Sequence, residues 1–191
     1  MKVSKHSGFT LIEAMVTLSV VAVLLSTGVP SFSAMIKNNR LATENHALRA
    51  VLGTARFEAK AQRAPVTVCR STNTIDCSAG NWGDGYIAFI DLDGDSHRDD
   101  DEQLLEQRVQ ENQGIELSYS QPSNILQFDS NGNTADSNGT FTFCDDRGAV
   151  AARGLIVSVI GVVRAAVVPQ SEGSDRIVQD HAGNEVTCDA V

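Results

Sequence analysis

The chain has 191 residues, and 42% of them are hydrophobic, which is enough for a single core beside a membrane segment. Its 15 basic and 24 acidic residues give a net charge of −9 at pH 7. This acidity argues against non-specific nucleic-acid binding, which requires positive charge facing the phosphates.

The first predicted element is the apolar run of residues 8–30, GFTLIEAMVTLSVVAVLLSTGVP. As a helix, residues 9–29 would rise roughly 31 Å, which matches a bilayer core of about 30 Å. Lys2 and Lys5 precede the run, so the N-terminus should stay in the cytoplasm and the rest of the chain should face outward. Glu13 interrupts the run at a cost of about 2.5–3.5 kcal/mol, which is smaller near a helix N-terminus.

This segment has three interpretations. It could be a plain membrane anchor that tolerates Glu13, or a secretory signal peptide cleaved after Ser33 beside small residues. The third interpretation rests on the motif G-F-T-L-I-E, which follows a short Lys-containing leader. This motif resembles the class III signal of type IV pilins and pseudopilins, and we favour this interpretation.

The resemblance implies roles for individual residues. In that family a prepilin peptidase cuts after the glycine, here Gly8, and the new N-terminal residue, here Phe9, is N-methylated. The family's glutamate, here Glu13, pairs with the amine of a neighbouring subunit during assembly. Electrostatics supports this pairing, because a free amine is the counter-ion that a buried carboxylate needs. Loss of Lys2 and Lys5 with the leader leaves 13 basic against 24 acidic residues, a net charge of −11.

After Pro30 the helix is expected to continue as an amphipathic stem until Pro65 stops it. Apolar residues recur on one face of this stem at Leu41, Leu48, Val51, Leu52, Ala55 and Ala59. The predicted organisation is a leader at 1–8, a transmembrane helix and filament core at 9–29, a stem at 30–63 and a β-rich head at 64–191.

Short strand-like runs separated by turn residues follow the stem. They cover 66–70, 85–91, 103–109, 115–120, 125–129, 140–144, 155–160 and 162–168. A long helix followed by antiparallel strands predicts an α+β fold.

The resemblance extends over nearly the whole chain. The matching pieces are V-P-S-F, N-N-R-L, A-R-F-E-A, V-T-V-C, N-W-G-D-G-Y, F-I-D, T-F-T-F-C-D and R-G-L-I-V-S. They are similar to the FimT/FimU minor pilins and the GspH pseudopilins, which share one family. This likeness implies the pilin fold, in which a long N-terminal helix packs on an antiparallel sheet. It also implies a structural subunit, not an enzyme, whose partners are a prepilin peptidase and other pilins.

The four cysteines are Cys69, Cys77, Cys144 and Cys188, and their spacing does not suggest zinc. Outside the cytoplasm disulfides are the simpler expectation. Three pairings are possible, and we favour Cys69–Cys77 with Cys144–Cys188. On the chain-entropy model they would contribute ~2.6 and ~4 kcal/mol, and the second would fasten the C-terminal tail to a core strand. Paired disulfides of this kind also favour the pilus branch of the family.

An acidic turn lies between two predicted strands. Asp91, Asp93, Asp95, Asp99 and Glu102 occupy positions 1, 3, 5, 9 and 12, the spacing of an EF-hand calcium loop. The match departs from that loop at position 6, where Ser96 replaces glycine, and in its strand-like flanks. The alternative is a solvated acidic hairpin without Ca²⁺. No other cofactor is expected.

DNA binding is a further hypothesis. Some FimT proteins resemble DNA receptors with a C-terminal G-R-x-R-type motif, but the matching stretch here, G-V-V-R, keeps only Arg164. One or two phosphate contacts would give little affinity.

The four histidines, His6, His46, His97 and His181, do not form a catalytic constellation with a nucleophile.

The sequence therefore predicts a single-pass inner-membrane protein with a cytoplasmic N-terminus and a periplasmic head, which later enters a filament. A FimT/FimU-type minor pilin is the favoured function. The alternatives are a GspH-type pseudopilin of type II secretion and a pilus DNA receptor for natural transformation.

Overall fold

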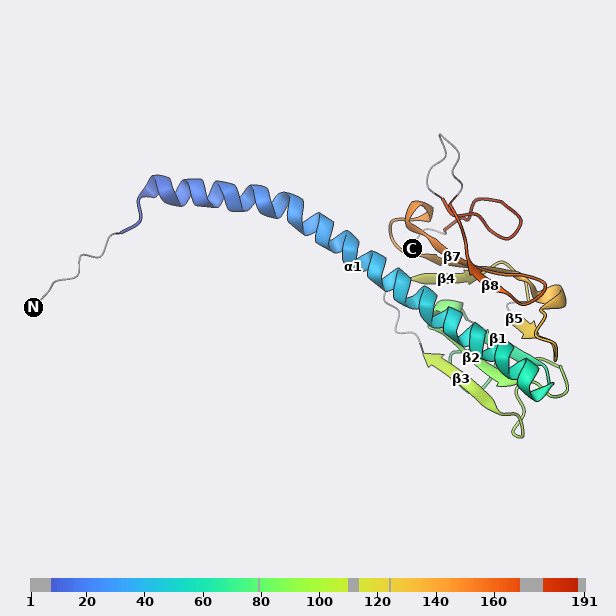
Figure 1. The fold of residues 1–191 in the computed structure, drawn as a ribbon. Coiled ribbons are helices and arrows are strands. Elements are labelled where there is room, and N and C mark those ends of the chain that lie inside the picture. The colour runs from blue at the N-terminus through green and yellow to red at the C-terminus, as the bar shows by residue number, and fades with distance from the viewer. Residues whose placement is uncertain (1–7, 79, 110–113, 124, 169–176, 189–191) are drawn as a thin grey trace, which may run out of the picture. The chain divides into compact units, whose positions relative to one another are not determined.

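The computed structural model describes residues 8–78, 80–109, 114–123, 125–168 and 177–188 (Figure 1). The chain divides into two compact units, Met1–Asn39 and Arg40–Val191, and each is described by itself. Most of the predicted leader, including Lys2 and Lys5, lies outside the described residues.

Helix α1 covers Leu11–Gln62 and contributes to both units. It runs through Pro30, although proline has no amide hydrogen to donate within a helix. The helix ends at Gln62, where Arg63 takes a left-handed backbone conformation with a φ of 54°. Pro65 follows two residues later, so the predicted stop is found at the expected place.

Two four-stranded antiparallel sheets form the rest of the second unit (Figure 1). The first sheet has the order β3-β2-β1-β5, made of Leu104–Val109, Gly85–Ile90, Val66–Arg70 and Ile125–Phe128. The second has the order β4-β6-β7-β8, made of Glu116–Tyr119, Gly139–Cys144, Arg153–Val157 and Val163–Ala165. Short 3-10 turns lie at Trp82–Asp84, Ala135–Ser137 and Ala149–Ala151.

All eight predicted strands exist, and the predicted α+β class is confirmed. The expected strand over residues 155–160 is wrong at its end, because β7 stops at Val157. Ser158 and Gly161 form a tight turn there, in which the Gly161 amide donates to the Ser158 carbonyl at 2.7 Å. Gly161 has a φ of 71°, a conformation that glycine adopts without steric cost.

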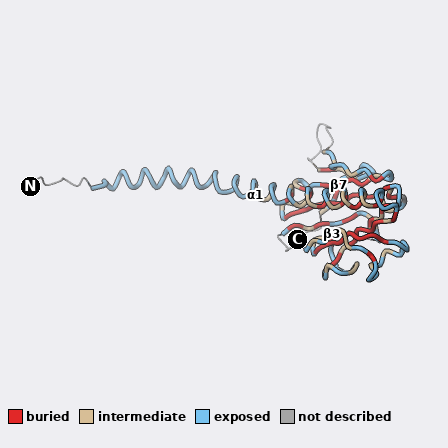
Figure 2. The backbone as a smooth tube through the Cα atoms, turned by 60° about the horizontal axis from the view of Figure 1, so that its bottom comes forward, coloured by how far each residue is buried: buried red, intermediate tan, exposed pale blue. Residues whose placement is uncertain are grey.

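The core lies between the C-terminal half of α1 and both sheets (Figure 2). The helix contributes one face whose side chains are fully buried, namely Leu41, Leu48, Leu52, Ala55 and Ala59. These residues pack in one cluster with Val68 and Leu126 of the first sheet and with Phe143 and Leu155 of the second. The predicted apolar stripe of the stem is therefore the surface on which the head is built.

Aromatic rings join the turn at Trp82 to the second sheet. Trp82 is 1% exposed, and its ring meets that of Phe141 edge-on with centroids 4.9 Å apart. Tyr119 stacks on Phe141 at 4.1 Å. Burial of the Tyr119 ring raises the pKa of its hydroxyl well above the ordinary range. Trp82 is thus a packing residue at the end of a strand, as its glycine-flanked position indicates.

Two disulfides fasten the head. Cys69 of β1 is bonded to Cys77, and Cys144 of β6 is bonded to Cys188 near the C-terminus. Around the second bond, Cys144 packs with Ala152, Val178 and Val186 in a small cluster apart from the main core. The bond therefore ties residues 177–188 to the second sheet, where they add apolar contacts of their own.

Arg56 connects α1 to two loops that are distant in sequence. Its Nε donates to the Gly132 carbonyl at 3.0 Å, and its Nη2 donates to the Ile160 carbonyl at 2.8 Å. A hydrogen bond from a charged donor to a carbonyl is stronger than one from a neutral donor. Arg56 thus holds the helix against the turns that follow β5 and β7.

We expect Arg56→Met to lower the free energy of unfolding by about 1–3 kcal/mol, because two charge-assisted hydrogen bonds are lost while the aliphatic packing is kept. The matched control is Arg49→Met, an exposed change on the same helix that should stay within about 0.5 kcal/mol of the parent. Denaturant unfolding of the full chain in detergent, followed by Trp82 fluorescence, measures both. Equal effects of the two changes would contradict the anchoring role.

Candidate functional site

The N-terminal unit exposes its apolar side chains. Phe9 is 83% exposed, Leu11 79% and Ile12 65%, and similar exposure continues along the helix to Met35. The helix is long and apolar enough to cross a membrane, with a mean hydropathy of 2.0 in its most apolar window. None of that window is buried inside the described structure. This surface therefore requires lipid or other protein around it.

The start of α1 is defined by Thr10 and Glu13. The Glu13 amide donates to Thr10 Oγ1 at 3.3 Å, and the Ala14 amide donates to the Thr10 carbonyl at 3.2 Å. Thr10 therefore caps the helix, and Glu13 lies in its first turn, where the unpaired N–H groups favour a negative charge. This cap was not among the features predicted above, although the spacing T-x-x-E is the signature of a capping box.

Three other polar side chains of the apolar segment form hydrogen bonds within the helix. Thr17, Ser19 and Ser26 donate their hydroxyls to the carbonyls of Ala14, Met15 and Val23, at 2.7–3.0 Å. Such bonds allow hydroxyls to enter an apolar environment. Glu13 differs from them because it is the one charged residue of the sequence between Gly8 and Ile36. Its carboxylate is solvent-exposed in the isolated chain.

Gly8 and Phe9 are exposed and precede the helix. A side chain added at Gly8 would meet nothing within 4 Å, so packing does not require glycine there. The peptide bond between Gly8 and Phe9, the predicted cleavage site, lies on accessible chain just before the capped helix.

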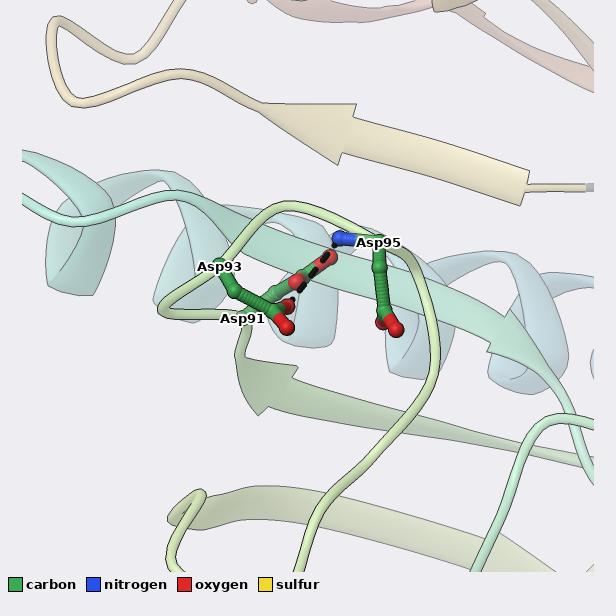
Figure 3. A group of neighbouring side chains, drawn as sticks. All are labelled: Asp91, Asp93 and Asp95. Carbon is green, nitrogen blue, oxygen red and sulfur yellow. Dashed lines mark hydrogen bonds between the residues drawn. The ribbon is translucent and has the colours of Figure 1, made fainter.

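The acidic turn between β2 and β3 brings three of its five predicted ligands together. One carboxylate oxygen from each of Asp91, Asp93 and Asp95 lies within 4.8 Å of the others (Figure 3). Asp99 and Glu102 are not members of this group. Glu102 is only 4% exposed, and its carboxylate accepts hydrogen bonds from the amides of Leu92 at 2.6 Å and Asp99 at 3.1 Å. The Glu102 carboxylate therefore stabilises the turn by bonding amides near both of its ends.

Arg164, the predicted DNA contact, is an exposed residue of β8 opposite Ile156 of β7. Arg153 is also exposed, at the start of β7. The histidines do not gather either: His46 lies on α1, His97 lies in the acidic turn, and His181 contacts the Thr140 hydroxyl at 3.3 Å. His6 lies outside the described residues.

Comparisons with known proteins agree with this architecture. The family model "Type II transport protein GspH" matches residues 44–161, and that of the prokaryotic N-terminal methylation motif matches residues 3–29. No curated protein matches the chain.

Two crystal structures of the type IV minor pilin FimU from Pseudomonas aeruginosa are similar in fold. The first is 23% identical, with a TM-score of 0.53, over 72% of this chain and 98% of that one. The second is 22% identical, with a TM-score of 0.51, over 66% of this chain and 94% of that one. Since the GspH model covers more than half of the sequence and the methylation motif precedes it, this chain belongs to the GspH family of type IV minor pilins and pseudopilins.

Proposed function

We propose that the chain is a minor pilin of the FimT/FimU type, a structural subunit that helps to prime or join a type IV pilus. One observation carries this proposal most directly: an exposed apolar helix has a single carboxylate in its first turn, directly after an accessible Gly-Phe bond. The fold shared with FimU and the two disulfides support the pilus over a secretion filament. A GspH-type pseudopilin of type II secretion is the alternative.

In the proposed mechanism the subunit first waits in the inner membrane, with its N-terminus cytoplasmic and its head periplasmic. A prepilin peptidase removes residues 1–8, and Phe9 becomes an N-methylated terminal amine. Glu13 then pairs with such an amine of a neighbouring subunit. The pairing offsets the cost of burying a carboxylate. The exposed apolar side chains then contact the helices of other subunits in place of lipid.

We do not favour a DNA receptor. Arg164 lies on a short edge strand of a strongly acidic chain, and a few arginines would neutralise few phosphates. An electrophoretic shift of DNA by the protein that is lost on changing Arg164→Ala would reverse this preference.

The first prediction concerns processing. Mass spectrometry of the protein purified from its own membranes should give a chain that begins with N-methyl-Phe9. Gly8→Val should block this cleavage, because only peptidase recognition needs a glycine where there is open space. Gly28→Val is the matched control, also in open space, and should be processed normally. A mature chain that begins at Ala34 would show a secretory signal peptide instead.

The second prediction concerns Glu13. We expect Glu13→Gln to leave the subunit in the membrane and to lower its amount in sheared filaments by at least about tenfold. The neutral amide lowers the cost of insertion into lipid and cannot form an ion pair with the amine. Immunoblots of membrane and filament fractions measure the ratio. Glu106→Gln, a neutralised exposed residue of β3, is the control, and equal ratios for both variants would refute the pairing.

The third prediction separates the two filaments. Deletion of the gene should abolish twitching motility and leave exoprotein secretion normal. Complementation with the parent chain should restore motility, and Glu13→Gln should not. Normal twitching with defective secretion would identify the pseudopilin instead.

A further inference from the structure

Asp91 is a buried carboxylate with one oxygen left unpaired. It lies just after β2 and is 0% exposed. Its Oδ2 accepts hydrogen bonds from Thr67 Oγ1 at 2.5 Å, Gln127 Nε2 at 2.9 Å and the Ser96 amide at 3.1 Å. Its Oδ1 is buried and has no hydrogen-bond donor within the described structure. Burying such an oxygen without a partner is costly, so it is available to a further donor or to a cation.

The carboxylates of Asp93 and Asp95 lie beside the Asp91 carboxylate (Figure 3). Asp93 Oδ1 accepts from the Asp95 amide at 3.2 Å, and Asp95 Oδ1 accepts from the His97 amide at 2.6 Å. These hydrogen bonds hold the exposed carboxylates of Asp93 and Asp95 close to the buried carboxylate of Asp91. The grouped oxygens lie within 4.8 Å of one another, which is about twice a Ca²⁺–oxygen distance of 2.3–2.6 Å, so a single ion can reach all three.

The backbone of the turn supports this arrangement despite its missing glycine. Position 6 of a calcium loop requires a sharp turn, which glycine usually makes. Here Ser96 takes that conformation with a φ of 64°, and its amide donates to Asp91. At position 6 the residue type therefore departs from the EF-hand pattern while the positive φ is kept. The flanks also depart from it, because they are the strands β2 and β3.

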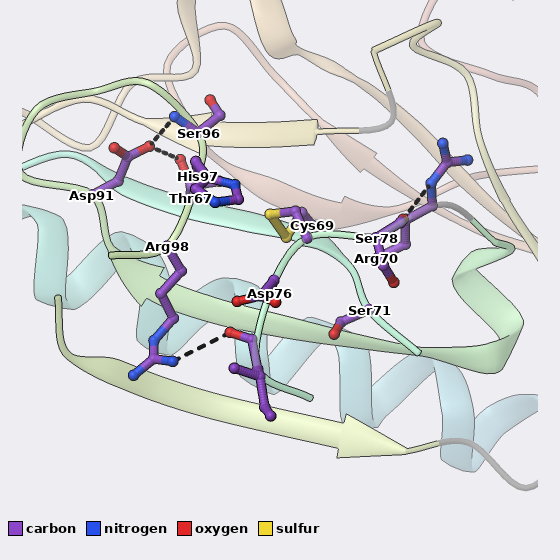
Figure 4. The surroundings of a disulfide bond; sticks show 12 residues. Thr67, Cys69, Arg70, Ser71, Asp76, Ser78, Asp91, Ser96, His97 and Arg98 are labelled. Carbon is purple, nitrogen blue, oxygen red and sulfur yellow. Dashed lines mark hydrogen bonds between the residues drawn. A yellow bond between two sulfur atoms is a disulfide. The ribbon is translucent and has the colours of Figure 1, made fainter. Parts of the chain in front are cut away.

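The neighbouring cation does not neutralise the group. Arg98 is the one arginine or lysine between Asp91 and Glu102, and its Nη1 donates to the Ile75 carbonyl at 3.2 Å in the loop closed by Cys69–Cys77 (Figure 4). The Arg98 side chain is thus engaged by the disulfide loop.

We propose that Asp91, Asp93 and Asp95 bind a calcium ion, with Asp91 Oδ1 as its buried ligand. Hard carboxylate oxygens in an irregular turn suit Ca²⁺, whereas Mg²⁺ demands near-ideal octahedral geometry and zinc favours histidine and cysteine. Through Asp91 the ion ties the β2–β3 turn to Thr67 of β1 and Gln127 of β5. This site does not depend on which filament the chain enters.

The test is a calcium titration of the full-length chain in detergent with its disulfides intact. Isothermal titration calorimetry with CaCl₂ should show one ion per chain, with a Kd of about 10⁻⁴–10⁻³ M as in extracellular calcium modules. At about ten times this Kd, the melting temperature should rise by about 3–6 °C over that in EGTA. MgCl₂ at equal concentration should give a clearly smaller rise.

Two matched variants separate a site from general charge screening. Asp93→Asn with Asp95→Asn keeps the oxygens that accept the turn's amides and removes two charges. It should lose the calcium response, and its melting temperature in EGTA should equal or exceed that of the parent, because like charges no longer repel. Asp100→Asn with Asp101→Asn removes two exposed charges of the same turn outside the group and should respond like the parent.

Three results would overturn the proposal. They are the same melting temperature in calcium and in EGTA, an equal effect of magnesium, or a full calcium response in the Asp93/Asp95 variant. The calorimetric titration of the unmodified chain decides the question even if a variant fails to fold.

Discussion

Burial of one face of α1 is the interaction on which the head depends. Five helical side chains from Leu41 to Ala59 are completely buried, and strands of both sheets pack on them in a single cluster. Each sheet has only four strands, so neither encloses a core alone. At about 25 cal/mol per Å² of apolar surface, this shared contact is a large part of what stabilises the fold. The helix is thus the central element of the head as well as the stem of the chain.

The same helix meets two different requirements along its length. Up to Ile36 it is apolar with one carboxylate, and from Lys37 onward charged residues alternate with the buried face. An all-round apolar helix suits lipid or other helices, whereas a one-sided stripe suits a sheet. The change occurs near Asn39, where the compact units also divide. One continuous helix therefore carries both an apolar segment and the one-sided stripe that packs on the sheets.

Local chemistry explains what the sequence could predict. The eight strands, the stop before Pro65 and the stem stripe follow from periodicity and turn residues, and the N-terminal motif identifies the family. Long-range packing explains what was missed. The separation into two sheets depends on pairing between distant strands such as β1 and β5. The burial of Asp91 depends on Thr67 and Gln127, which are far from it in sequence. Glu102 fits a ligand spacing, but the nearby amides of Leu92 and Asp99 occupy its carboxylate.

The cap at Thr10 has a consequence for maturation. The first hydrogen bonds of the helix lie on the C-terminal side of the Gly8–Phe9 peptide bond. In them Thr10 accepts from the amides of Glu13 and Ala14. Cutting that bond leaves every helical hydrogen bond in place. If the proposed peptidase cuts there, proteolysis would change the terminal charge and leave the hydrogen bonds at the start of the helix unchanged. The new ammonium group of Phe9 would then lie one residue before the capping residue Thr10.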